Sequence, residues 1–130
     1  MNIGLLGFGV VGGAVLELTQ SRSDIAVSRV LLRSPKAGLP EGLATYDFND
    51  ILTDDAIDTV VEVMGGLHPA YEYVSAAMER GKNVVTANKA LIAAYYPDLT
   101  ALAKKKGVAL RCTAAVGGGI PWLVNLARVK

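Results

Sequence analysis

The first twelve residues constrain the fold of this chain more than any other part of its sequence. A short apolar run over residues 2–6 leads into a G-x-G-x-x-G pattern, and an amphipathic stretch follows. The first glycine of such a pattern permits a tight turn, the second lets the backbone approach a pyrophosphate, and the third lets the helix pack on the strand. The helix N-terminus then offers free N–H groups to the phosphates. We predict a dinucleotide site, with a structural glycine turn as the alternative. Its residues are Gly7, Phe8, Gly9, Val10, Val11 and Gly12.

Composition narrows the class of protein. At 130 residues the chain is predicted to form one domain, residues 1–130, whose hydrophobic core is large enough to be stable without disulfide bonds or bound metals. A net charge of +1 gives no electrostatic case for nucleic acid, and no apolar run approaches the roughly 18 residues of a membrane span. The start lacks the basic region of a signal peptide. The single cysteine, Cys112, excludes an internal disulfide and fits a cytoplasmic protein; we expect it in the core.

Apolar runs alternate with amphipathic stretches along the chain. This alternation predicts an α/β fold, a Rossmann-type doubly wound parallel sheet with helices on both faces. The predicted strands cover residues 2–6, 26–32, 44–46, 58–64, 83–86 and 108–112. The predicted helical segments follow the glycine pattern, cover 49–53, run from Pro69 to Gly81, and cover 89–94, 98–106 and 121–129. Asn88 is expected to cap the helix after it.

Apolar spacing also predicts which side of two helices is buried. The first helix is expected to bury Val11, Ala14, Val15 and Leu18. The helix that begins at Pro69 is expected to bury Ala70, Val74, Ala77 and Met78.

The end of the second predicted strand bears on the choice of cofactor. An NAD site usually carries Asp or Glu there for the ribose 2′-hydroxyl, whereas this chain has Arg33, Ser34 and Lys36. An arginine offers forked donors to a 2′-phosphate and can stack on adenine. We therefore predict NADP as the preferred cofactor over NAD, with a solvated basic turn as the alternative.

Other candidate residues follow predicted strands, at the sheet edge where α/β proteins bind ligands. Lys89 opens a helix there, where it either holds a charged group or acts as an acid or base; a surface lysine is the alternative. The glycine turn at residues 64–66 allows close approach to a ribose or phosphate. The glycine turn at residues 117–121 lines the nicotinamide or substrate pocket or acts as a hinge. The candidates are Met64, Gly65, Gly66, Thr86, Ala87, Asn88, Gly118, Gly119, Ile120 and Pro121.

Two ionisable residues stand apart from these motifs. His68 has no second histidine or suitably spaced ligand beside it, so we expect a surface or loop position. Glu62 lies in an apolar strand, where it either pairs locally or supports the site.

At these motifs the chain resembles the N-terminal nucleotide-binding domain of homoserine dehydrogenase. The matching stretches are residues 7–12, 61–66 with Pro69-Ala70, 81–91 and 115–121, and they follow the family's order. The resemblance implies an oxidoreductase that reversibly reduces L-aspartate 4-semialdehyde to L-homoserine with NAD(P)H, in the biosynthesis of threonine, methionine and isoleucine. It implies that Lys89 contacts nicotinamide and substrate and takes part in proton transfer. Gly118, Gly119, Ile120 and Pro121 would line the substrate side.

The resemblance also implies what this chain lacks. The family's other catalytic lysine and its substrate-binding acids lie in a second domain, so this chain is expected to be a fragment that binds cofactor but turns over little or nothing. The full-length enzyme is expected to be a homodimer. Where many members carry a glutamate that helps to place a monovalent cation, this chain has Thr113. The carbonyls of Val116, Gly118 and Ile120 remain candidate cation ligands.

Two other functions stay open at this point. One is the nucleotide-binding domain of another amino-acid or semialdehyde dehydrogenase. The other is a complete small protein that senses NAD(P). Each takes a dinucleotide as partner, and the enzymes also take a small-molecule substrate.

Overall fold

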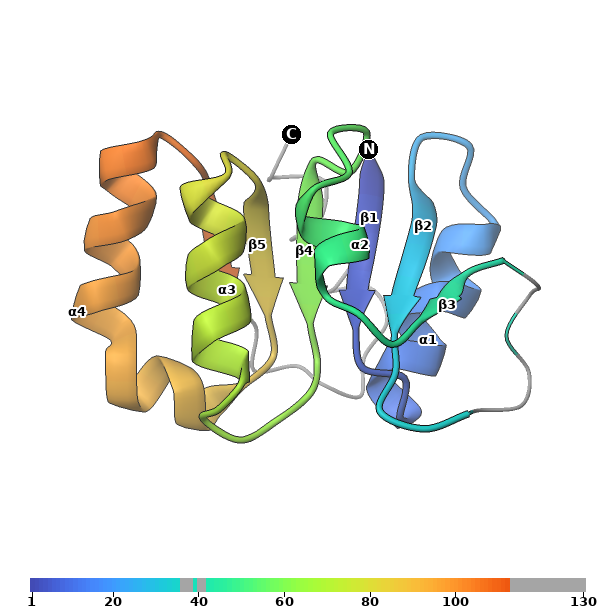
Figure 1. Ribbon diagram of the computed structural model, residues 1–130, viewed down its shortest axis with the longest axis horizontal. Helices are drawn as coiled ribbons and strands as arrows, with labels where there is room; N and C mark the ends of the chain where they lie inside the picture. Colours follow the sequence, from blue (N-terminus) through green and yellow to red (C-terminus); the bar gives the residue numbers. More distant parts are fainter. Residues whose placement is uncertain (36–38, 40–41, 113–130) are drawn as a thin grey trace.

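The computed structural model describes residues 1–35, 39 and 42–112, which form one parallel sheet covered by helices (Figure 1). The strand order is β3-β2-β1-β4-β5-β6, and every neighbouring pair is parallel. The strands are β1 (Asn2–Leu6), β2 (Ala26–Leu31), β3 (Ala44–Thr45), β4 (Thr59–Glu62), β5 (Asn83–Thr86) and β6 (Leu110–Cys112). The predicted strands are thus confirmed, most of them with shorter ends.

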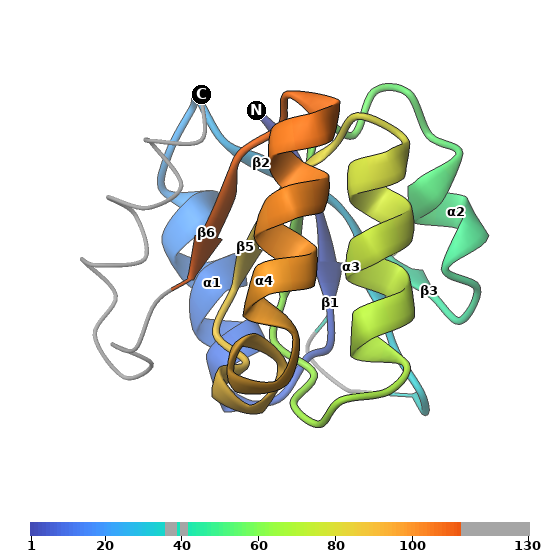
Figure 2. The same ribbon diagram turned by 90° about the vertical axis from the view of Figure 1, so that its left-hand side faces the viewer.

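Helices cover both faces of the sheet, which confirms the predicted doubly wound architecture (Figure 2). They are α1 (Val10–Gln20), α2 (Asn49–Leu52), α3 (Ala70–Glu79) and α4 (Lys89–Lys106). One core cluster joins Val15 of α1 to the sheet residues Ile3, Leu5 and Val61. The other core cluster lies on the opposite face, under α2, α3 and α4. Burial of apolar side chains on both faces explains why the central strands read as continuous apolar runs.

The strand order reverses direction between β1 and β4. From β1 the chain first builds outward through β2 and β3, and β4 then returns to the other side of β1. In open α/β sheets, ligands bind at such a switch point, outside the carboxyl ends of the strands. The turns that follow β1, β2, β4 and β5 all leave the sheet at this carboxyl edge.

The buried face of α1 agrees with the prediction at Val15 and differs from it at Ala14 and Leu18, and the side chain of Val11 is not among those described. The side chains of Val15, Leu16 and Thr19 are buried with Gly12, whereas Ala14 is exposed and Leu18 is only partly buried. An ideal Cβ on Gly12 would lie 2.6 Å from the carbonyl oxygen of Gly7, so Gly12 faces the turn that follows β1. This contact sets the rotation of the helix, and apolar spacing alone could not show it.

The C-terminal half of the described chain contains one kinked helix where we predicted two. α4 runs from Lys89 to Lys106, but Tyr95 has φ −128° and ψ 17° and Pro97 follows within the helix. A proline cannot donate the helical hydrogen bond, which explains the kink. The side chain of Asn88 accepts from the backbone N–H of Leu91, so the predicted cap is confirmed. The predicted helix at 121–129 lies outside the described residues.

Two further predictions have clear outcomes. The predicted buried face of α3 is confirmed in full, because Ala70, Val74, Ala77 and Met78 are all buried. The prediction that Cys112 is a core residue is wrong, because its side chain is exposed. Cys112 ends β6, which pairs only with β5 in the described part of the chain and so lacks cover from a neighbouring strand. Among the described residues, none of the helices is long and apolar enough to cross a membrane.

Candidate functional site

The glycine turn after β1 has the geometry that its sequence predicts. Gly7 has φ +101°, a conformation that side chains disfavour, and its N–H donates to the carbonyl of Leu31 at 3.0 Å. Gly12 packs against that same turn, as described above. An ideal Cβ on Gly9 would meet nothing within 4 Å, so the backbone there faces open space. The turn therefore leaves room for a ligand beside the start of α1.

The start of α1 suits an anion. Gly9 is the N-cap residue and its helix has no side-chain cap and no acidic residue in the first turn. The first N–H groups of a helix have no partner within the helix, so here they remain available to a ligand. Val10 beside them is 93% exposed. Open space at Gly9 and free N–H groups at the start of α1 are features that an anion-binding site requires.

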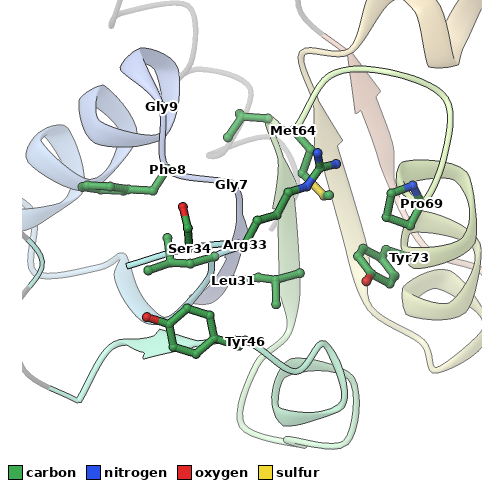
Figure 3. A pocket seen from close by; sticks show the side chains of 12 residues that line it. Gly7, Phe8, Gly9, Leu31, Arg33, Ser34, Tyr46, Met64, Pro69 and Tyr73 are labelled. Atoms are coloured by element: carbon green, nitrogen blue, oxygen red, sulfur yellow. The ribbon is translucent and has the colours of Figure 1, made fainter. Parts of the chain in front are cut away.

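A pocket of about 560 Å³ opens beside the glycine turn (Figure 3). This volume lies within the usual range for small-molecule sites. The pocket brings Arg33 and Ser34, from the end of β2, to the same cavity as Gly7 and Gly9. None of the described lining residues is acidic, and Lys36 lies outside the described part of the chain. The lining residues are Gly7, Phe8, Gly9, Leu31, Leu32, Arg33, Ser34, Tyr46, Val63, Met64, Pro69 and Tyr73.

Half of these lining residues were not among the predicted site residues, namely Leu31, Leu32, Tyr46, Val63, Pro69 and Tyr73. Tyr46 follows β3, Pro69 precedes α3, and Tyr73 lies on α3 with its ring stacked on Phe48 at a centroid distance of 4.2 Å. No motif marks Tyr73, which comes to line the same pocket as the residues after β2 only in the folded protein. Tyr46 could have been found, since it is the last residue of a predicted strand and so lies at the sheet edge where α/β proteins bind ligands.

The remaining predicted residues lie at the ends of β4 and β5. Gly65 and Gly66 both have φ +76°, and of this turn only Met64 lines the described pocket. Lys89 is exposed as the first residue of α4. Thr86, Ala87, Asn88 and Lys89 share the carboxyl edge with the glycine turn but do not line that pocket.

Glu62 connects these two strand ends. Its side chain is fully buried and accepts hydrogen bonds from Thr86 Oγ1 at 2.5 Å and from the backbone N–H of Met64 at 2.9 Å. Asn88 Nδ2 lies 3.4 Å from the same carboxylate. The sequence left open whether Glu62 pairs locally or supports the site, and the structure shows pairing with residues that we had predicted as site residues.

His68 occupies an exposed loop position, as predicted. Its Nδ1 lies 2.8 Å from Glu72 Oε2, and its Nε2 lies 3.2 Å from the hydroxyl of Tyr95. The hydrogen bond to His68 holds the pKa of Glu72 below its usual 4.5. These contacts link the start of α3 to the kink of α4 at the surface.

The predicted substrate-side and cation residues belong to the C-terminal part of the chain. Gly118, Gly119, Ile120 and Pro121, together with Val116 and Thr113, lie outside the described residues. Within residues 1–35, 39 and 42–112, no group of three or more His, Cys, Asp or Glu side chains is placed to hold a metal ion.

Comparison with known proteins identifies close relatives. Residues 7–113 match the family model described as homoserine dehydrogenase, NAD binding domain. Homoserine dehydrogenase of Lactococcus lactis is 43% identical over 143 residues, covering 98% of this chain and 33% of that protein. The Bacillus subtilis enzyme of the same name is 34% identical, with 97% and 32% coverage. The chain therefore spans about a third of the length of these relatives.

Solved structures agree with the sequence matches. A crystal structure of Staphylococcus aureus homoserine dehydrogenase at pH 6.5 superposes with a TM-score of 0.81 and 36% identity, covering 94% of this chain and 34% of that one. The Thiobacillus denitrificans homoserine dehydrogenase gives a TM-score of 0.80 and 38% identity, with 88% and 30% coverage.

Proposed function

This chain belongs to the homoserine dehydrogenase family, whose NAD-binding domain it matches, and we propose that it supplies the cofactor site of an enzyme that interconverts L-homoserine and L-aspartate 4-semialdehyde. The single observation that carries this proposal is the glycine turn at the switch point. There, the open backbone at Gly9 and the uncapped start of α1 adjoin a pocket of matching size. The family match supplies the reaction.

The arrangement of the pocket gives each segment a role. The turn of residues 7–12 and the N-terminus of α1 would hold the pyrophosphate, and Arg33 and Ser34 would hold the adenosine end. The nicotinamide end would then extend toward the ends of β4 and β5, where Met64–Gly66 and Thr86–Asn88 lie. A nicotinamide cofactor, when bound, would donate the hydride in the reductive direction and accept it in the oxidative direction.

Lys89 has a separate role in this proposal. Its exposed side chain stands at the start of α4 on the ligand-binding edge. A lysine ammonium there would hold the substrate oxygen and stabilise the negative charge that develops on it, or exchange its proton. The substrate side at residues 118–121, the cation ligands at Val116, Gly118 and Ile120, the homodimer and the cytoplasmic location also remain part of the proposal.

A preference for NADP over NAD is the finer part of the proposal. It is supported by the placement of Arg33 in the pocket and by the lack of an acidic residue among the described lining residues. A carboxylate at this place would repel a 2′-phosphate, whereas a guanidinium binds it with forked hydrogen bonds.

Calorimetric titration of this chain with NADPH and with NADH tests the proposal. We expect saturable binding of both cofactors, with NADPH bound more tightly. Equal or tighter binding of NADH would contradict the NADP preference but keep the dinucleotide site. If a chain that is folded by circular dichroism binds neither cofactor, the proposed function of these residues is wrong.

A further inference from the structure

Glu62 is a buried carboxylate that packing does not explain. It is 0% exposed at the last residue of β4, where an apolar side chain would fill the same space. None of the ion pairs among the described residues involves it. A charged group in the interior is costly unless hydrogen bonds replace its water. The three groups that donate hydrogen bonds to the Glu62 carboxylate therefore indicate its structural role.

Each oxygen of Glu62 lies within hydrogen-bond distance of at least one group that can donate to it. Thr86 Oγ1 accepts from the N–H of Asn88 at 3.0 Å, so its own proton is free to point at Glu62 Oε1. Asn88 Oδ1 accepts from the N–H of Leu91, so its NH₂ group faces Glu62 Oε2 and the carbonyl of Gly66. The backbone N–H of Met64 can only donate. A carboxylate has two oxygens that can accept from these three groups, whereas a glutamine amide at the same place has only one.

These bonds join segments that are distant in sequence. Through Met64 and Gly66 they fix the turn after β4, and through Thr86 and Asn88 they fix the end of β5 and the first turn of α4. Met64 also lines the pocket, and Lys89 is the residue after Asn88. With the adenosine end at β2, this is the half of the sheet edge that would face the nicotinamide.

We propose that Glu62 is a positioning residue for the nicotinamide half of the bound dinucleotide. Its carboxylate holds the turn at Met64–Gly66 and the start of α4 in fixed positions without itself contacting the ligand. This inference rests on the proposed dinucleotide site. It predicts that Glu62 matters for the nicotinamide end and not for the adenosine end.

Truncated ligands separate the two ends. ADP-ribose and 2′-phospho-ADP-ribose keep the adenosine and pyrophosphate groups of NADH and NADPH but lack nicotinamide. We expect the wild-type chain to bind each cofactor more tightly than its truncated form. We expect Glu62→Gln to weaken cofactor binding by about tenfold, the effect of one charge-assisted hydrogen bond, and to leave binding of the truncated ligands unchanged.

A matched pair of threonine variants tests the proposal even if the Glu62→Gln variant does not fold. Thr86→Val removes the hydroxyl that donates to Glu62. Thr59→Val makes the same change at the opposite end of β4, where a buried hydroxyl bonds to Asp58 at 2.8 Å. Thr86→Val should reproduce the selective loss of cofactor affinity, and Thr59→Val should change neither ligand. Circular dichroism and the thermal midpoint report whether each variant is folded.

Several results would overturn the inference. One is an equal loss of affinity for cofactor and truncated ligand in the folded Glu62→Gln and Thr86→Val variants, which shows a general structural role. Another is no loss for either ligand. Equal affinity of the wild-type chain for cofactor and truncated ligand also overturns the inference, because the nicotinamide group then contributes nothing to binding. Only a wild-type chain that binds no ligand of either kind would also defeat the proposed function.

Discussion

Neighbouring glycines in α1 have opposite structural requirements. At Gly12 an added Cβ would lie 2.6 Å from the backbone oxygen of Gly7, and a backbone atom cannot move aside as a side chain can. At Gly13 an added Cβ would meet nothing within 4 Å, and the residue lies inside a helix with no positive φ. The sequence alone shows two adjacent glycines, but only Gly12 packs closely against the turn at Gly7.

We expect Gly12→Ala to destabilise the chain by about 1–3 kcal/mol, as overpacking does, and to weaken dinucleotide binding because the turn at Gly7 must shift. Gly13→Ala is the matched control and should stabilise the chain by roughly 0.5–1 kcal/mol, since alanine loses less backbone entropy in a helix. Urea denaturation measures both changes. Similar effects of the two variants would contradict a specific contact at Gly12.

Arg33 is expected to decide between the two cofactors. Arg33→Ala should weaken NADPH binding by at least about tenfold, because a charge-assisted contact to the 2′-phosphate is lost, and should change NADH binding little. Calorimetry on the wild type and the variant measures this difference. Arg29→Ala provides the control, because Arg29 lies on β2 but does not line the pocket. An equal loss for NADH and NADPH would assign Arg33 to the adenine or to the fold instead.

At the scale of elements, Lys82 holds the edge of the sheet opposite to the site. Its side chain is 4% exposed, and its ammonium donates to the carbonyls of Asp54 at 2.8 Å and Ile57 at 2.6 Å. It thereby ties the start of β5 to the loop that leads into β4. Burial lowers the pKa of Lys82 below 10.5, and the negative charges of nearby Asp55, Asp54 and Asp58 partly oppose this.

We expect Lys82→Met to lower the free energy of unfolding by about 1–3 kcal/mol near neutral pH, because two carbonyls lose their donor. The variant should bind dinucleotide as the wild type does, since the opposite edge is intact. Urea denaturation and calorimetric titration measure the two effects. A loss of cofactor affinity in a folded Lys82→Met variant would contradict this separation of the two edges.

The same residue gives a pH dependence of stability. Between the lowered pKa of folded Lys82 and the unfolded value of 10.5, the unfolded chain binds more protons at this residue. Raising the pH through this window therefore favours the folded state. The stability of the wild type relative to Lys82→Met should rise as the pH approaches 10.5, because other titrating groups cancel in the difference. Urea denaturation of both proteins at several pH values tests this, and a falling difference would show the opposite sign.

At the scale of the whole molecule, the chain accounts for about a third of the length of its relatives. We expect these 130 residues alone to bind cofactor with little or no oxidation of homoserine. A chimera in which they replace the matching segment of the Lactococcus lactis enzyme should oxidise homoserine. Activity of that chimera on another amino alcohol, and none on homoserine, would instead assign a different substrate.

Within this chimera, Lys89→Ala should lower kcat at least tenfold, which corresponds to about 1.4 kcal/mol of barrier. The expected cause is the loss of a cation beside the reacting oxygen. Lys104→Ala is the control, because it removes an exposed lysine from the other end of α4. Steady-state kinetics with homoserine measure both variants. A nearly unchanged kcat in Lys89→Ala would remove Lys89 from the chemistry.

Local patterns in the sequence determined most of the fold. The order of strands and helices, the glycine turn, the buried face of α3 and the Asn88 cap follow from apolar spacing, from glycine and from capping residues. Each of these depends on residues only a few positions apart, so a single sequence is enough to predict it. The same patterns placed Arg33 and Lys89 after strands at the carboxyl edge of the sheet, and a ligand-binding role for either residue remains a prediction.

Contacts between distant segments were decided only by the tertiary structure. The rotation of α1 depends on the approach of Gly12 to Gly7, and the inclusion of Tyr73 in the pocket depends on where α3 meets the sheet. Glu62 finds its side-chain partners 24 and 26 residues away, on β5 and at the start of α4. A periodic pattern shows that such a residue is buried but not what it meets, because its partners are chosen by the packing of the whole sheet.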